Sequence, residues 1–364
     1  MGNCIEKPAP PPPPPPPQLL PSTTTDSTTT TSAAAATVVV KLHGPASNPL
    51  TLYLRIALSY KPLTLRFIDT PRELYTLETL DDAVSGSAES ILEYAESRFP
   101  QPPLLARGRG KGWDEEMVGP MVVRMGRLQH RSMRRHVERV VEWGAEVAAR
   151  GGKSAGKVEA TPRVEVRRFA KRYGMLLDVL LEHAQMEERV VFPVIQGSDP
   201  GVCMSANEDH GRDLPIMNGI KEAIKSIVAI DPGTPDFREA LNDLSSRLET
   251  LQDNCKKHFE EEEKYVFPLM EAADDTIEQE KRMLSQCIDL MPGTHSHLFS
   301  FFIEGLLPHE AIQYLDLLLN YNDQERAAQM FRTLIDERHF KRLRHSLGEV
   351  LQQKEDHFEN KLCR

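Results

Sequence analysis

The sequence predicts a mostly α-helical protein built around an antiparallel four-helix bundle. Four long segments between residues 117 and 272 carry apolar residues at helical spacing, and Gly/Pro clusters separate them. Long helices joined by short loops favour an antiparallel bundle. A His-x3-Glu pair also occurs twice on these segments, 75 residues apart. We expect a small α/β module before the bundle and extra helices after it, over residues 273–364.

Composition narrows the class of protein. The 364 residues correspond to two or three domains at about 150 residues each. A net charge of −10 argues against nucleic-acid binding. The five cysteines are scattered, which favours a reducing compartment over a disulfide scaffold. No apolar run has the length of a membrane span. We therefore expect a cytoplasmic protein.

Residues 1–37 predict a linker. The eight prolines Pro10–Pro17 favour a polyproline II rod, and a Ser/Thr run follows over Ser22–Ser32. The opening residues resemble the start of proteins that carry myristate on Gly2 and palmitate on Cys4, although Glu6 stands where that motif prefers Ser or Thr. Two acyl chains would hold the protein at the plasma membrane surface.

Residues 38–105 predict a small α/β module. The strand-like segments Val38–Leu42 and Leu63–Ile68 flank one helix, and Ser87–Arg98 forms another. The stretch Glu89–Tyr94 resembles a helix start in the thioredoxin-like N-terminal half of glutathione S-transferases, where a Glu-Ser pair usually holds the glutathione carboxylate. The segment from Asp69 to Ala88 is too short for the usual helix and β-hairpin. We therefore expect a reduced thioredoxin-like module without the glutathione site.

The repeated motif lies on the second and fourth segments of the bundle, residues 117–272. His183 and Glu187 align with His258 and Glu262, and a Val-Phe-Pro sequence follows each pair. Residues four apart share one face of a helix, and here that face is the apolar one, which should enter the core. On the fourth segment the same face includes Tyr265. Buried carboxylates need a partner, and neither apolar stripe carries a Lys or Arg to provide it. The repeat therefore predicts a metal site.

The first and third segments each add one histidine at a comparable depth. The predicted ligands are four His and two Glu: His130, His183, Glu187, His210, His258 and Glu262. A structural zinc takes four ligands, so zinc is the weaker prediction. Six nitrogen and oxygen ligands with two carboxylates able to bridge suit a pair of iron ions. Water, hydroxide or a diatomic gas such as O2 would fill the remaining coordination positions.

The pattern His / His-x3-Glu / His / His-x3-Glu resembles the hemerythrin-like HHE cation-binding domains. Oxygen carriers of that family have a second histidine four residues after the third-segment ligand, where this chain has Leu214. With one histidine on that segment, the chain is similar to the hemerythrin domains of iron-sensing ubiquitin ligases. Its Pro-rich start is similar to plant hemerythrin-like proteins. The resemblance implies iron binding and allows O2 binding.

The other polar residues of these segments are expected to have no direct role in metal binding. We expect His136 to be solvated between neighbouring arginines, and His295 to lie in a loop or helix start. The arginines of the first segment should pair with the acidic fourth segment. A solvated face or an outer coordination shell is expected for three acids: Glu188, Glu261 and Glu263.

Together these features predict a non-catalytic di-iron protein that senses iron or oxygen, or sequesters iron. Pro215 removes a backbone donor from the third segment, so we expect this helix to be the least stable when iron is absent. Two alternatives stay open. One is an oxidase or other redox enzyme that uses the same centre with O2. The other is a membrane-tethered scaffold whose terminal modules bind an unidentified protein partner.

Overall fold

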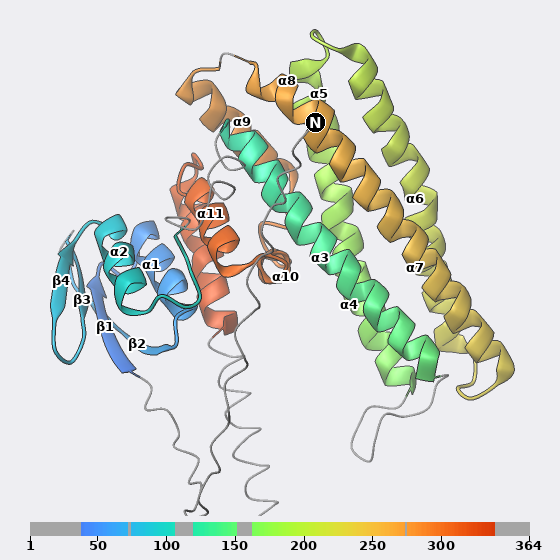
Figure 1. Cartoon of the computed structure of the whole chain (residues 1–364), viewed down its shortest axis with the longest axis horizontal. Coiled ribbons are helices and arrows are strands. Elements are labelled where there is room, and N and C mark those ends of the chain that lie inside the picture. Colours follow the sequence, from blue (N-terminus) through green and yellow to red (C-terminus); the bar gives the residue numbers. More distant parts are fainter. Residues whose placement is uncertain (1–37, 72–73, 106–118, 151–161, 274, 339–364) are drawn as a thin grey trace, which may run out of the picture. The chain divides into compact units, whose positions relative to one another are not determined.

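The computed structural model describes residues 38–71, 74–105, 119–150, 162–273 and 275–338. Over this part the chain is mostly helical: long helices pack as a bundle after a small four-stranded sheet, and further helices follow (Figure 1). The predicted fold class is confirmed. Gly2 and Cys4 lie outside the described residues, so their acylation stays a prediction. Among the described helices, none has the length and apolar character needed to cross a membrane.

The N-terminal module is a mixed sheet with strand order β2-β1-β3-β4. Strand β1 pairs parallel with β2 and antiparallel with β3, and β3 forms a hairpin with β4. The side chains of Val40 and Leu42 alternate into the core from β1. The elements in chain order are β1 (Val38–Gly44), α1 (Pro49–Ser59), β2 (Leu63–Asp69), β3 (Tyr75–Glu78), β4 (Ala83–Gly86) and α2 (Ala88–Arg98).

The segment between Asp69 and Ala88 holds a β-hairpin but, among its described residues, no helix. It therefore lacks the full helix and β-hairpin of the family pattern, and a tight turn joins its two short strands. The backbone N–H of Thr79 donates to the carbonyl oxygen of Asp82 at 2.8 Å, and the Thr79 hydroxyl donates to the same oxygen at 3.0 Å. Membership of the thioredoxin-like family and the absence of a glutathione site remain predictions.

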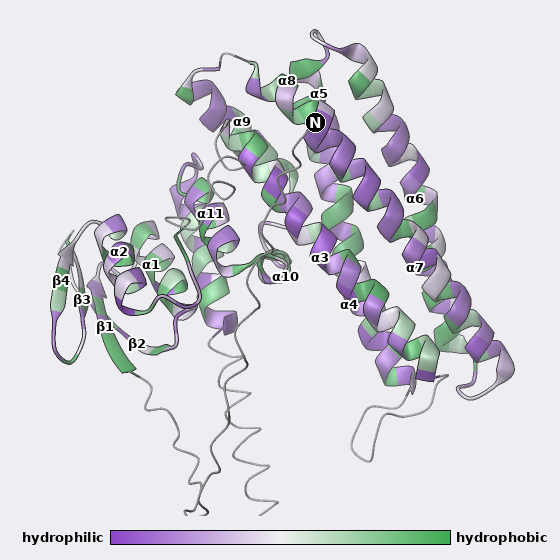
Figure 2. Cartoon of the chain, viewed as in Figure 1, coloured by the Kyte–Doolittle hydropathy of each residue, from purple (hydrophilic) through white to green (hydrophobic). Residues whose placement is uncertain are grey.

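The bundle consists of four long helices, each with polar and apolar faces (Figure 2). Helix α3 packs against α4 and α7, and α6 packs against the same two helices. The helices therefore enclose one core. Their bounds are α3 (Met121–Arg150), α4 (Pro162–Met186) with α5 (Phe192–Ile195), α6 (Pro200–Ala229), and α7 (Pro235–Glu261) with α8 (Phe267–Glu271).

Local sequence signals explain where the helices start and how closely they approach. The Asp199 carboxylate caps α6, and the Thr234 hydroxyl caps α7 by accepting from the N–H of Phe237 at 3.2 Å. Gly126 lets α3 lie directly against α8, because a Cβ atom there would stand 2.8 Å from the Phe267 ring. Pro215 lies inside α6, and the helix continues through it.

The C-terminal helices α9 (Ile277–Leu290), α10 (Phe299–Glu304) and α11 (Pro308–Leu318) pack on α3, and α9 also packs on α4. This packing corrects the prediction for His136. Its ring is 1% exposed and stacks on Phe301 with 3.9 Å between ring centroids. Burial lowers the pKa of His136 to about 4. The local arginines indicate a solvated face, but the C-terminal helices cover this one.

The basic face of α3 divides between two partners. Arg127 and Arg134 pair with acids in the continuation of α7, as predicted. Arg131 and Arg135 instead bind Glu310 of α11, whose side chain is 3% exposed. Burial would raise the pKa of Glu310, but the hydrogen bonds from Arg135 and from the Leu307 N–H hold it below its ordinary value.

Glu310→Ala should lower the free energy of unfolding by about 2 kcal/mol, because it removes the buried partner of Arg135. The loss is smaller than for a fully buried pair, since Arg135 is 27% exposed. Urea denaturation followed by circular dichroism measures it. The control is Glu325→Ala, whose side chain is 81% exposed beside Arg332 and should contribute little. Equal losses in both variants would contradict the prediction.

Candidate metal centre

Each His-x3-Glu motif ends in a π-helical turn. These turns span Glu187–Val191 after α4 and Glu262–Val266 after α7. The N–H of Phe192 donates to the carbonyl oxygen of Glu187, five residues back, and Phe267 does the same to Glu262. A proline, which has no N–H to continue the α-helical ladder, follows each phenylalanine. Each π turn begins at the glutamate of its motif and ends two residues before this proline.

The extra residue in the π turn shifts the buried face, which corrects a detail of the predicted stripe on the fourth segment. Tyr265 belongs to that stripe by α-helical spacing, yet its side chain is 49% exposed. Val266 and Phe267 are buried in its place. The sequence holds a signal for this shift, because the same Phe-Pro pair follows both motifs.

The structure brings the six predicted ligand residues together in the bundle core. His130 comes from α3 and His210 from α6, and the repeated pairs come from α4 and α7 with their π turns. His210 is 11% exposed at its side chain, and the other five are between 0% and 6%. Their potential ligand atoms form two groups, in each of which all atoms lie within 4.8 Å of one another. The groups are His130, His183, Glu187 and Glu262, and His210, His258, Glu187 and Glu262.

The two carboxylates belong to both groups. Glu187 places Oε1 3.2 Å from His183 Nε2 and Oε2 3.5 Å from His210 Nε2. Glu262 places Oε2 3.4 Å from His130 Nε2 and Oε1 3.3 Å from His258 Nε2. Each carboxylate therefore presents one oxygen to each pair of histidines. This arrangement would let both carboxylates bridge a pair of metal ions.

All four imidazoles direct Nε2 inward and Nδ1 outward. The Nδ1 atom of His130 lies 3.0 Å from Glu263, and that of His210 lies 2.9 Å from Glu188. An outward acceptor keeps the proton on Nδ1 and leaves the Nε2 lone pair for a metal. Glu188 and Glu263 thus contact the predicted ligand residues from outside the cluster, which is compatible with one of their two predicted roles.

The residue before each single histidine contacts the second histidine of the same group, and sequence reasoning missed both of these residues. Gln129 places its Oε1 2.9 Å from Nδ1 of His183. Asp209 lies at the equivalent place, with its carboxylate 3.7 Å from Nδ1 of His258. The signal that could have found them is their shared position, directly before the ligands of α3 and α6. The outer contacts therefore follow the same twofold repeat as the ligands.

Protons occupy the cluster when it is metal-free. Burial opposes charge on His130 and His210, but Glu187, Glu262 and the outer acids raise their pKa values to about 10 and about 9. Burial and the neighbouring Glu187 raise the pKa of Glu262 to about 7. Metal ions bind deprotonated ligands, so metal uptake at this site would release protons.

Several buried atoms of the cluster have no hydrogen-bond partner. They are Glu187 Oε2, both carboxylate oxygens of Glu262, Nε2 of His210 and both ring nitrogens of His258. Buried polar groups without partners are costly. All of these atoms except Nδ1 of His258 point into the cluster and are good metal ligands, so the residues fit a pair of metal ions. The donor set of imidazole and carboxylate suits iron.

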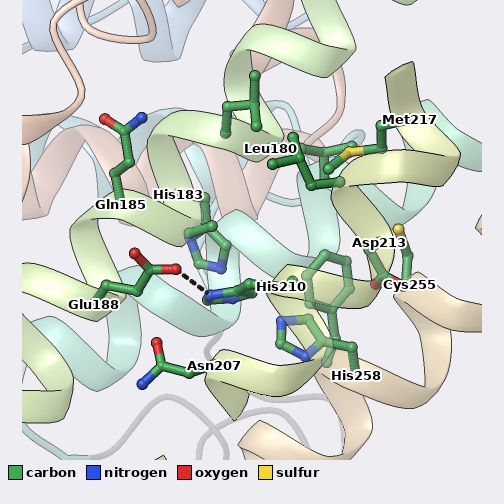
Figure 3. Close-up of a pocket in the computed structure, with 15 residues that line it drawn as sticks. Leu180, His183, Gln185, Glu188, Asn207, His210, Asp213, Met217, Cys255 and His258 are labelled. Carbon is green, nitrogen blue, oxygen red and sulfur yellow. Dashed lines mark hydrogen bonds and ion pairs between the residues drawn. The ribbon is translucent and has the colours of Figure 1, made fainter. Parts of the chain in front are cut away.

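Two pockets reach the second group. The first, of about 310 Å³, lies between α4, α6 and α7 and has His210, His258 and His183 in its lining (Figure 3). Leu214 lies on its wall and is 42% exposed. The second pocket, of about 430 Å³, is acidic, and Asp209, Glu261 and Glu262 line it.

Comparisons with known proteins agree with this geometry. A family model described as the hemerythrin HHE cation binding domain matches residues 121–249. Zinc finger protein BRUTUS of Arabidopsis thaliana is 20% identical over 166 residues, which are 46% of this chain and 12% of that protein. No solved structure matches the chain. The chain therefore contains a hemerythrin-like domain with a buried His/Glu cluster consistent with a metal site. The family model's match ends before His258 and Glu262. These two residues are identified by their alignment with His183 and Glu187 in the internal repeat.

Glu263→Gln should weaken metal binding about tenfold, because it removes the charged acceptor for the His130 Nδ1 proton. Glu188→Gln should have a similar effect through His210. Competition with a chelator measures both. Glu261→Gln is the matched control, since this side chain is 40% exposed and pairs only at 3.7 Å with Lys257. The prediction is wrong if Glu261→Gln weakens binding as much as Glu263→Gln does.

Proposed function

We propose, on the premise of a hemerythrin-like domain, that this protein binds two iron ions and serves iron or oxygen sensing, or iron sequestration, without catalysis. The proposal depends on one observation: each carboxylate directs one oxygen to each of the two histidine pairs. His130 and His183 would hold one ion, His210 and His258 the other, with Glu187 shared. Glu262 would be the second shared ligand. The bound ions would supply redox chemistry and affinity for O2.

The chain's own residues determine how such ions are held. The outer acids fix the imidazole tautomers, and the buried setting excludes water from most of the cluster. Five of the six side chains are 6% exposed or less. Burial of this kind favours retention of bound ions, which suits sequestration. A sensor must also exchange ions with its surroundings, and the pocket beside His210 gives a route for that exchange.

A second candidate is a di-iron oxidase or other redox enzyme. The pocket beside His210 favours it, because a small molecule could reach the second group there. An optical spectrum with and without O2, followed by peroxide detection, separates the two functions. Peroxide formed on repeated exposure to O2 would favour the enzyme.

The lipid anchor and the scaffold function stay proposals from the sequence. Gly2→Ala should move the protein from the membrane fraction to the soluble fraction, if acylation holds it at a membrane. Pull-down with the N-terminal and C-terminal modules tests for an unidentified protein partner.

Metal analysis should find about two irons per chain, because two carboxylates can bridge two ions. His183→Ala and Glu262→Ala should each lose most of the metal. His297→Ala is the control, since His297 is exposed and lies outside both groups. One tightly held zinc per chain, unaffected by the first two changes, would contradict the proposal.

Iron should also protect α6 from hydrogen exchange. This helix contributes His210, and Pro215 removes one of its backbone hydrogen bonds. Iron that binds only the folded form stabilises it by mass action, by about 2.7 kcal/mol at a hundredfold excess over the dissociation constant. Mass spectrometry of residues 200–229 with and without iron measures the difference. Equal protection in both states would favour static storage over sensing.

A further inference from the structure

The acidic pocket beside Glu262 has a closed counterpart in the other half of the bundle. The repeat that aligns His183 with His258 also aligns Met186 with Glu261 and Val190 with Tyr265. Met186 and Val190 are 1% and 7% exposed. Tyr265 is 49% exposed and lines the pocket together with Glu261. The same stretch of the repeat is therefore buried in one half and accessible in the other.

Helices α3 and α6 differ in the same way. Counted back from their single histidines, Gln129 corresponds to Asp209 and Met125 to Ser205. Gln129 and Met125 are fully buried. Ser205 is exposed and lines the acidic pocket with Asp209. Helix α9 covers the closed half, because it packs against α3, α4 and the π turn at Glu187–Val191. The chain thus closes one of two equivalent openings and leaves the acidic one.

The carboxylates of this pocket form a series from the surface to the cluster. The side chain of Glu261 is 40% exposed, that of Asp209 12% and that of Glu262 2%. The Asp199 carboxylate also lines the pocket, but it caps two backbone N–H groups of α6. Among the described residues that line the pocket there is no lysine or arginine. Its volume of about 430 Å³ has room for a cation with water ligands.

Basic side chains contact this series only at its outer end. Lys257 approaches Glu261 to 3.7 Å, and its side chain is 65% exposed. Asp209 accepts from Arg212 at Oδ1, at 2.6 Å, and turns Oδ2 toward Nδ1 of His258 at 3.7 Å. Ion pairs with such exposed partners are weak. A divalent cation can therefore displace the basic side chains.

The inner end of the pocket carries atoms that lack partners. Glu262 and His258 line it, and their side chains are 2% and 6% exposed. Neither the oxygens of Glu262 nor the ring nitrogens of His258 have a hydrogen-bond partner. A cation that moves inward along the carboxylates thus ends at a buried carboxylate able to bind it. Because Glu262 belongs to both candidate metal groups, this path leads directly to the centre.

The pocket beside His210 is less suited to an ion. Its acids accept hydrogen bonds, Glu188 from His210 and Asp213 from Asn254. Its remaining walls are mainly apolar and include Leu180, Leu181, Leu214, Met217 and Phe259. A cation gains no ligands from apolar walls, and the loss of its water is costly there. Of the two pockets that reach the second group, the acidic one therefore suits a cation better.

We propose that divalent cations enter and leave the centre mainly through the acidic pocket, attracted in turn by Glu261 and Asp209 on the way to Glu262. The inference rests on the proposed function, because it requires that the cluster holds metal. It gives Glu261 a role in the rate of exchange and none in the bound state, since Glu261 lies outside both candidate metal groups.

Stopped-flow mixing of the metal-free full chain with Co²⁺, followed by the absorbance of the bound ion, tests the proposal. Glu261→Gln should slow uptake about fivefold at low ionic strength, because it removes one charge that attracts the ion. Release into excess EDTA should slow by the same factor, so that the dissociation constant stays unchanged. Glu260→Gln is the matched control: it removes the same charge from an exposed position outside the pocket and should change neither rate.

Two further variants separate the two pockets. Glu261→Met combined with Ser205→Met reproduces the closed half, where Met186 and Met125 stand, and should slow exchange more than Glu261→Gln does. Leu214→Trp narrows the pocket beside His210 and should leave both rates unchanged. If the double variant does not fold, Glu261→Gln carries the test alone.

Equal uptake rates in the unchanged chain and in Glu261→Gln would overturn the proposal. So would a Leu214→Trp variant that slows uptake more than Glu261→Gln does. Slower uptake with an unchanged release rate would mean weaker binding, which would make Glu261 part of the bound state and overturn the proposal too. Metal analysis separates the two levels of failure. Two ions per chain with rates that Glu261→Gln does not change overturn the route alone, whereas a chain that takes up no metal overturns the proposed function as well.

Discussion

Two carboxylates, Glu187 and Glu262, lie in a core that otherwise excludes water, and the arrangement around them follows from the cost of burying their charge. An isolated buried carboxylate is strongly disfavoured. Four imidazoles therefore face them, and acceptors outside the imidazoles fix the tautomer that leaves Nε2 directed inward. Protons on His130 and His210 compensate this charge when no metal is bound, but several buried atoms of the cluster still have no hydrogen-bond partner. Cations would replace the protons and occupy those atoms, so the stability of the bundle and its proposed metal binding have the same physical origin.

The internal repeat explains the symmetry of the centre and also its asymmetry. Equivalent residues supply the ligands, the outer acids, the π turns and the phenylalanines that stack on His130 and His210. The two halves of the repeat differ beside the pocket between α4, α6 and α7. Phe259 closes one half and Ala184 leaves the other open. The acidic pocket beside Glu262 adds a second approach, with charge that suits a cation. The halves thus share one fold but differ in what can reach them.

The sequence predicted the helices, the bundle and the convergence of the six ligand residues, because apolar periodicity and the repeated motif report directly on helix faces. It did not predict features that depend on contacts distant in sequence. His136 is buried by Phe301, and Arg135 binds Glu310, 175 residues away. The π turn that exposes Tyr265 changes the helical period within one turn, which a constant spacing cannot represent.

The C-terminal helices reach the ligands through buried hydrogen bonds. Gln129, which holds His183, also donates to the Met291 sulfur at 3.2 Å and lies 3.4 Å from the Tyr314 hydroxyl. That hydroxyl lies 2.8 Å from Nε2 of His295. Next to His183 in the chain, Glu182 accepts the backbone N–H groups of Gly293 and Thr294, both at 2.7 Å. A buried polar network is favourable only when its members are satisfied together. Displacing the C-terminal segment would therefore free Gln129 and loosen His183, and loss of metal would remove one reason for that segment to stay docked. The C-terminal helices thus connect the surroundings of His183 to a segment that supplies no residue to either candidate metal group.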